Sequence, residues 1–194
     1  MSKPNFFQRL TQAFRPPQSS APADTALAQL AVLLTPAAAQ ADVLAEIRLA
    51  DTEPHAYFSR FEDALCQRGI EEAAEVSPWL ALVDALERCG VLTECDWKID
   101  GEELAHRLQK LMKRHHCNPD DSRLQALAAQ KLAPIGTFAP AIRTLLASHD
   151  LTLAFLDIDS DSYPLVLLPD TQLAAAQQLA AQCRKRIIVL TENT

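Results

Sequence analysis

The sequence predicts an α+β fold in which several helices pack against a small mixed sheet of about four strands. Glycine is scarce, with 4 residues in 194, while alanine and leucine are abundant, so helices should dominate. Two apolar runs near the C-terminus flank a short acidic segment, which is typical of a β-hairpin. A helical pattern separates this hairpin from a last apolar run, which predicts a βαβ crossover.

Residues 1–23 are expected to form a basic arm that is distinct from the single globular domain expected over residues 24–194. The arm carries three cationic residues and no acidic residue, and its Pro- and Ser-rich end, residues 16–22, is typical of a flexible linker. Aromatic residues at helical spacing over residues 5–14 allow a weak, peripheral membrane contact. One short helix with three cations anchors only marginally, so no firm membrane attachment is expected.

Helical spacing of apolar residues predicts four helices in the N-terminal half of the domain, the first from Asp24. Ser77 followed by Pro78 marks the start of the fourth, because serine caps helix N-termini and proline suits the first turn. Gly69 and Gly90 should end the third and the fourth. The four apolar stripes are Leu27, Leu30 and Leu34; Val43, Leu44 and Ile47; Tyr57, Phe58, Phe61 and Leu65; and Trp79, Val83 and Leu86.

Residues 91–97 alternate apolar and polar side chains, which predicts a half-buried strand. Cys95 and Trp97 would share its buried side, and Asp96 would face water. A core tryptophan with its N–H satisfied is the expected role of Trp97. Because the strand ends close to a helix cap at Asp100, this tryptophan could instead line the rim of a groove.

Three further helices follow this strand. Asp100 with Glu103 resembles a capping box and predicts a helix to about residue 115. Asn118, before a proline, predicts the start of a second helix, and Thr137 is expected to cap a third. Their apolar faces comprise Leu104, Leu108 and Leu111; Leu124, Leu127 and Leu132; and Phe138, Ile142 and Leu145.

The C-terminal third contains the predicted hairpin and crossover. Residues 151–158 and 164–168 are expected to form antiparallel strands joined by the acidic turn. Asp170 should cap an alanine-rich helix, and residues 187–190 should form the last strand. The last two strands should run parallel, because a helix connects them. With residues 91–97 as a fourth strand, the sheet would be mixed.

The acidic turn of the hairpin is the candidate site, since several carboxylates converge there beside expected strands. Aspartate and serine also satisfy the backbone of ordinary turns, so turn chemistry alone is a second interpretation. The end of the strand over residues 91–97 is expected to lie nearby. The predicted partner-binding residues are Asp157, Asp159, Asp161, Tyr163, Asp96 and Trp97.

An apolar strand that ends in Asp-x-Asp is similar to the start of the site in haloacid-dehalogenase-type phosphatases, where the first aspartate attacks phosphorus. Asp157, Asp159 and Asp161 therefore allow an alternative function, a metal-dependent phosphate-ester hydrolase. No later acidic pair could complete a Mg²⁺ site, and a calcium loop would need Gly at Ser162 and Glu at Leu168. The sequence predicts no catalytic residue, no metal site and no cofactor.

Charge and cysteine content limit the partners and the compartment. The formal charge of −7 combines +3 on the arm with −10 on the domain, so most of the surface should repel nucleic acid. Such acidity suits a basic protein partner, or solubility alone. Five cysteines, an odd number without a Cys-x-x-Cys pair, favour a reducing cytoplasm. No apolar run reaches the roughly 18 residues of a spanning helix.

Three stretches of the chain resemble an uncharacterised bacterial family described only as a domain of unknown function. They are residues 77–86 (SPWLALVDAL), residues 96–98 (DWK) and residues 159–165 (DSDSYPL). The resemblance covers roughly residues 57–183 and implies a bacterial cytoplasmic protein. It implies no catalytic residue.

The favoured functional hypothesis is a non-enzymatic cytoplasmic binding protein that uses the acidic hairpin tip. It would act as an adaptor, or as an inhibitor of a basic partner in the manner of an immunity protein, which is an analogy at the level of composition. The metal-dependent hydrolase remains the alternative, so the sequence leaves the question of enzymatic activity open while favouring binding.

Overall fold

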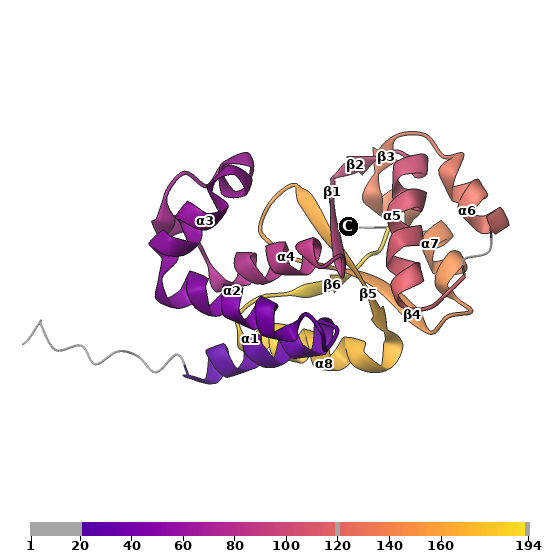
Figure 1. Ribbon diagram of the computed structural model, residues 1–194. Coiled ribbons are helices and arrows are strands. Elements are labelled where there is room, and N and C mark those ends of the chain that lie inside the picture. The colour runs from indigo at the N-terminus through magenta and orange to yellow at the C-terminus, as the bar shows by residue number, and fades with distance from the viewer. Residues whose placement is uncertain (1–20, 119–120, 193–194) are drawn as a thin grey trace, which may run out of the picture.

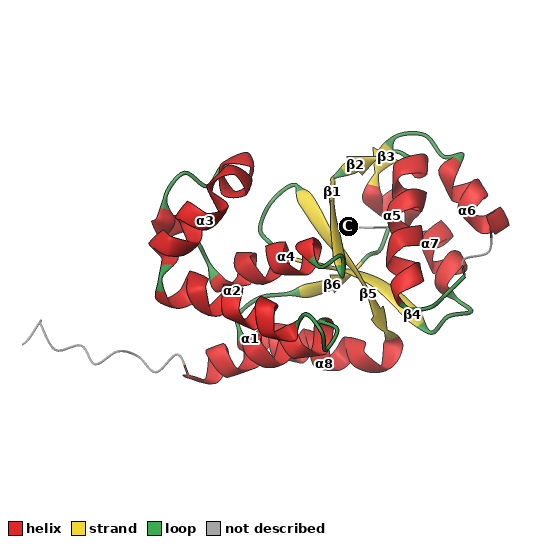
Figure 2. Cartoon of the chain, viewed as in Figure 1, coloured by secondary structure: helices red, strands yellow, loops and turns green. Residues whose placement is uncertain are grey.

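The computed structural model describes residues 21–118 and 121–192. Helices cover both faces of a four-stranded sheet, which confirms the α+β class (Figures 1 and 2). None of the helices in these two ranges is long and apolar enough to cross a membrane. The elements are α1 (Ala21–Leu34), α2 (Gln40–Thr52), α3 (Pro54–Gln67), the 3₁₀ helix η2 (Ala73–Glu75), α4 (Pro78–Arg88), β1 (Leu92–Asp96), β2 (Lys98–Ile99), α5 (Gly101–Arg114), α6 (Asp121–Ala128), β3 (Ala133–Pro134), the 3₁₀ helix η3 (Ile135–Phe138), α7 (Ala139–Leu146), β4 (Leu151–Leu156), β5 (Ser162–Pro169), α8 (Asp170–Gln182) and β6 (Ile187–Val189).

The four strands of the sheet lie in the order β1-β5-β4-β6, and all neighbours pair antiparallel. The hairpin of β4 and β5 is confirmed. Because β5 and β6 both pair antiparallel with β4, they run in the same direction with β4 between them. The crossover through α8 therefore joins parallel strands that are not neighbours. The sheet is therefore entirely antiparallel instead of mixed, because β4 lies between the two parallel strands that α8 connects.

The two central strands are apolar on both sides because two helical layers cover the sheet (Figure 2). Leu165 and Leu167 of β5 belong to a core formed with α5, α6 and α7. Val166 and Leu168 belong to a second core formed with α1, α2, α4 and α8. This alternation follows from the two-residue period of a strand. The hairpin is therefore the shared wall of two cores.

Local signals correctly place several helix ends. The Ser77 hydroxyl accepts a hydrogen bond from the Leu80 N–H at 3.2 Å and caps α4. Asp100 caps α5 in the same way. Gly69 and Gly90 follow α3 and α4 with positive φ angles, the backbone conformation that glycine adopts most readily.

Three expected helix starts differ in the structure. Helix α1 begins at Ala21, earlier than Asp24, and residues 1–20 of the expected basic arm over residues 1–23 lie outside the described residues. Thr137 caps no helix, because it lies within η3 and α7 follows directly. Asp170 is the first residue of α8 instead of its cap. Its Oδ1 accepts a hydrogen bond from the Thr152 hydroxyl at 2.6 Å, which fastens α8 to β4.

The strand expected over residues 91–97 is shorter in the structure. Strand β1 ends at Asp96, and Trp97 lies beyond it with 45% of its surface exposed, so its expected buried side is wrong. Beyond Trp97 the backbone enters a second, two-stranded sheet, which the sequence patterns did not indicate, in which β2 pairs with β3. This change of sheet turns Trp97 away from the core that Cys95 enters.

The start of α5 packs closely against the end of α6 at Gly101. The Gly101 N–H donates to the Gln130 carbonyl at 3.1 Å. A Cβ atom at this position would lie 2.1 Å from the Leu127 carbonyl oxygen and 2.7 Å from that of Gln130. Both obstacles are backbone atoms, so no side-chain rotation would relieve the clash.

We expect Gly101→Ala to lower the free energy of unfolding by about 3 kcal/mol, because α5 and α6 must separate to admit the methyl group. Gly69→Ala is the matched control, since its Cβ would meet no atom within 4 Å and only its φ of +76° is unfavourable. That strain costs about 1 kcal/mol. Chemical denaturation measures both values, and equal losses would contradict the close approach.

Candidate functional site

The acidic turn over residues 157–161 joins β4 to β5, and Asp157 determines its shape. The Asp157 carbonyl accepts the indole N–H of Trp79 at 2.8 Å, and its N–H donates to the Arg186 carbonyl at 3.0 Å. One carboxylate oxygen accepts the N–H of Asp159 at 3.0 Å, and the other pairs with the Arg186 guanidinium. Asp157 is therefore fully engaged in holding the turn, which is the role of an Asx turn.

The other two carboxylates of the turn face solvent. Asp159 has a positive φ of 57°, its side chain is 74% exposed, and its carboxylate lies 3.7 Å from the Lys185 ammonium. Asp161 is exposed and has no ion-pair partner among the described residues. Lys185 and Arg186, which precede β6, thus offset two of the three negative charges of the turn.

The end of β1 lies beside this turn, because Asp96 pairs with Ser162 in the sheet register. Trp97 follows at once, and the Lys98 ammonium lies 4.2 Å from the centre of its ring. The Asp96 carboxylate accepts the Trp97 N–H at 2.7 Å. Trp97 is one of three large apolar residues exposed in the described ranges, with Val32 and Leu132.

Tyr163 follows the turn on β5 and is half-buried. Its ring meets that of Phe155 edge to face at 4.9 Å, and its carbonyl accepts the Cys95 thiol at 3.7 Å. Burial raises the pKa of this thiol to about 12, so Cys95 is no nucleophile at neutral pH. The structure thus brings all six sequence-predicted residues to one end of the sheet. Asp157 is occupied there by turn contacts, and Tyr163 is partly occupied by packing.

The turn carboxylates do not form a cage for a cation. Asp157 is paired with Arg186, and Asp159 faces solvent beside Lys185. In the described part of the chain no group of three His, Cys, Asp or Glu residues could hold a metal ion. No observation at the turn therefore favours the metal-dependent hydrolase.

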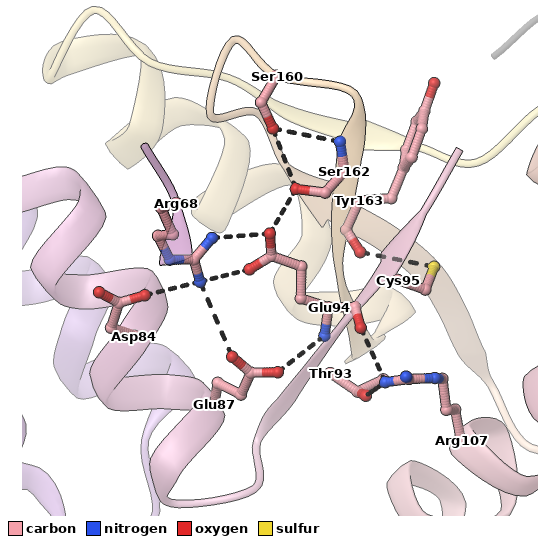
Figure 3. Close-up of polar contacts among 10 residues, drawn as sticks. All are labelled: Arg68, Asp84, Glu87, Thr93, Glu94, Cys95, Arg107, Ser160, Ser162 and Tyr163. Carbon is pink, nitrogen blue, oxygen red and sulfur yellow. Dashed lines mark hydrogen bonds and ion pairs between the residues drawn. The ribbon is translucent and has the colours of Figure 1, made fainter. Parts of the chain in front are cut away.

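A charged network that the sequence reading missed lies behind the turn and centres on Arg68 (Figure 3). Arg68 follows α3, and its side chain is 18% exposed. Its Nη1 donates to Glu94 Oε1 at 2.7 Å, and its Nη2 contacts the other Glu94 oxygen. The same Nη2 lies 2.7 Å from Asp84 Oδ1 and 3.8 Å from Glu87 Oε2. One guanidinium thus serves three carboxylates.

Glu94 extends this network in three directions. Its carboxylate accepts the hydroxyl of Ser162, which lies 3.0 Å from the Ser160 hydroxyl in the turn. Its backbone N–H donates to Glu87 at 3.2 Å, and its carbonyl accepts Arg107 Nη1 at 2.8 Å (Figure 3). Both backbone groups are therefore satisfied on the side of β1 that has no neighbouring strand, which closes this edge of the sheet.

The two most buried carboxyl groups of the network have pKa values shifted in opposite directions. Burial alone would raise the pKa of Glu94, but hydrogen bonds from Arg68 and Ser162 and the charge of Arg68 lower it below 4.5. Burial raises the pKa of Asp84, and the charges of Arg68 and Arg88 oppose this only in part. Glu94 is therefore the firmly ionised partner of Arg68, and Asp84 is the carboxylate with an incomplete environment.

A cavity of about 460 Å³ lies beside the contact between the network and the turn. Its lining includes Arg68, Glu94, Ser160 and Ser162, together with the apolar side chains of Ile70, Leu80 and Ile158. A polar cavity of this size can admit water or a small polar group. The turn thus borders a cavity that has both polar and apolar walls.

One signal in the sequence could have revealed part of this network. Asp84 is the only charged residue in the apolar run over residues 77–86, and a charge within a buried helix face requires a partner. Nothing in the local pattern identifies that partner as Arg68, or links either residue to Glu94. These contacts join residues that are far apart in the chain.

Comparison with known proteins identifies a family and no function. The family DUF6630, described as a domain of unknown function, matches residues 26–190. No curated protein and no solved structure matches the chain.

We expect Glu94→Gln to lower the free energy of unfolding at pH 7 by about 2 kcal/mol, because it removes a charged hydrogen-bond acceptor of Arg68 and Ser162. A carboxyl group whose pKa is lower in the folded protein than in the unfolded chain stabilises the fold at pH values above its unfolded pKa. This stabilisation is lost as the pH falls through the folded pKa. The difference between wild type and variant should therefore shrink below pH 4.5.

Glu87→Gln is the matched control for this pH series. Its carboxylate is 41% exposed and lies at the longer distance of 3.8 Å from Arg68. Ion pairs of this kind contribute less than about 1 kcal/mol. Denaturation curves between pH 3 and pH 7 compare the two variants, and an equal, pH-independent loss in both would contradict the assignment.

Proposed function

The chain belongs to the DUF6630 family, and from this premise we propose that it is a non-catalytic cytoplasmic binding protein, an adaptor or inhibitor, that contacts a protein partner through its hairpin tip. The proposed surface, the tip face, comprises Asp96, Trp97, Asp159, Asp161 and Tyr163. Asp157 maintains the shape of this surface through its turn contacts.

The observation that carries this proposal is the exposure of Trp97 among charged residues. Tryptophan dominates binding energy at many protein interfaces because it buries a large area with few rotatable bonds. On the tip face the ring is flanked in sequence by Asp96 and Lys98, and the register of β1 with β5 pairs Asp96 with Ser162, the residue after Asp161 of the turn. An anchoring aromatic residue with a charged rim is the usual anatomy of an interface.

The charge of the tip face favours a basic partner. Asp161 and Asp96 have no cationic partner of their own among the described side chains, and Asp159 is largely exposed. The chain as a whole carries −7, so its long-range field attracts cationic proteins. Such carboxylates contribute mainly to the association rate and to specificity, whereas burial of the tryptophan contributes affinity.

The state of the cysteines supports a reducing compartment. None of the five cysteines forms a disulfide, and Cys95 is buried as a small apolar residue. Proteins of oxidising compartments commonly pair such residues. A cytoplasmic location is therefore part of the proposal, and it agrees with what the resemblance to a bacterial family implies.

We expect Trp97→Ala to weaken partner binding at least tenfold while leaving the melting temperature nearly unchanged, because the ring is exposed and outside both cores. The partner is first captured from an extract of the source cells on the immobilised chain and then purified for calorimetry. Asp159→Asn combined with Asp161→Asn should slow association and reduce its salt dependence. Asparagine is used because it tolerates the positive φ of Asp159.

Leu132→Ala is the control for this experiment, since Leu132 is 66% exposed and lies outside the tip face. It should change affinity less than twofold. If Leu132→Ala weakens binding and Trp97→Ala does not, the partner binds elsewhere and the tip face is not the interface.

A further inference from the structure

Strand β6 is the other edge of the sheet, and its outer side is closed less completely than that of β1. On its inner side β6 pairs with β4, and α8 packs against it. No strand of the described residues pairs with its outer side. Edge strands of soluble proteins are commonly protected by a charged residue, a proline or a bulge, and Ile187–Val189 contains none of these.

The hydrogen bonds between β4 and β6 show which backbone groups face outward. The Asp157 N–H donates to the Arg186 carbonyl at 3.0 Å, and the Leu190 N–H donates to the Leu153 carbonyl at 3.1 Å. Residues 186 and 190 therefore direct their backbone groups toward β4. Because these directions alternate along an antiparallel strand, residue 188 also faces β4, and residues 187 and 189 face away from it.

Val189 is the open position of this edge. The Ile187 carbonyl accepts Gln177 Nε2 of α8 at 3.1 Å, and Ile187 is only 4% exposed, so α8 covers that position. Val189 is half-buried, and its outward N–H and carbonyl have no hydrogen-bond partner among the described residues. Backbone groups of this kind favour pairing with a further strand.

The charges that flank β6 indicate which strand fits. Three basic residues, 184–186, precede the strand, and Glu192 follows it. An antiparallel copy of β6 centred on Val189 would place Arg186 opposite Glu192 of the second copy, whereas a parallel copy would align like charges. The Arg186 side chain is 69% exposed and contacts Asp157 through Nη2, so further N–H donors remain for this pair. Glu192 is exposed. Opposite charges on facing residues stabilise a strand pair.

We propose that β6 pairs antiparallel with β6 of a second copy of this chain, and that the two-fold axis passes beside Val189. The Val189 N–H of each copy donates to the Val189 carbonyl of the other, which joins the two sheets into one. Such a contact is self-complementary and closes as a dimer. It uses the edge opposite β1, contains none of the tip-face residues and does not depend on the proposed function.

Sedimentation equilibrium of the full chain tests this proposal. We expect a monomer that converts to a dimer, and to no larger species, as the protein concentration rises. Hydrogen exchange followed by NMR gives the position of the contact, because exchange of the Val189 N–H should slow with concentration while that of Ile188, which already faces β4, stays the same. A monomer at all concentrations up to about 1 mM would overturn the proposal and leave this edge to a strand of a different protein.

Val189→Pro should abolish the dimer with little change in the melting temperature, because proline removes an N–H that faces away from β4. Val189→Thr is the matched control, since it keeps this N–H and the β-branched shape, and it should still dimerise. Trp97→Ala should also dimerise as the wild type does, which separates this contact from the tip face. A folded Val189→Pro variant that still dimerises would refute the proposed pairing.

Glu192→Lys provides a second test that leaves the backbone unchanged, in case Val189→Pro does not fold. It places like charges opposite each other and should weaken self-association at least tenfold. Glu62→Lys is the control, because Glu62 is exposed on α3 and the change in net charge is the same. Equal effects of the two substitutions would contradict the register centred on Val189.

Discussion

Glu94 connects both helical layers of this protein to the edge of its sheet. An edge strand exposes backbone groups that would otherwise pair with another chain or remain unsatisfied. Here α4 supplies a carboxylate to the Glu94 N–H, and α5 supplies Arg107 to its carbonyl. The Glu94 side chain accepts hydrogen bonds from Arg68, the residue that follows α3, and from Ser162 at the hairpin tip. Four separate segments are thus positioned by one residue of β1.

This arrangement explains why charged residues occupy a region where a core could have continued. Replacing a buried ion pair by apolar residues is often neutral, so the Arg68 network is weak evidence for stability in itself. Its effect is geometric, because a guanidinium has a fixed set of donor directions and its three carboxylates come from α4 and β1. Arg68 thereby links the end of α3 to α4 and to β1, in addition to the apolar contacts of Tyr57 and Leu65.

The topology of the sheet explains the character of the hairpin. Because β1 pairs with β5 and β6 pairs with β4, both hairpin strands are interior to the sheet, and they are covered on both faces. Antiparallel strands usually have one wet face. The apolar runs on both sides of the acidic turn are required here by the second helical layer. The buried hairpin reaches solvent at the acidic turn, where Asp159 and Asp161 are exposed.

The sequence by itself determined the local structure: the hairpin, the N-caps at Ser77 and Asp100, and the apolar stripes of the helices all depend on residues a few positions apart. It also placed the candidate residues near one turn. Only the tertiary structure decided that β4 separates the crossover strands, that Trp97 leaves the core for solvent, and that Arg68 meets Asp84 and Glu94. Periodicity reports which face of an element is apolar, and strand order and ion pairing depend on contacts between distant segments, which no local pattern encodes.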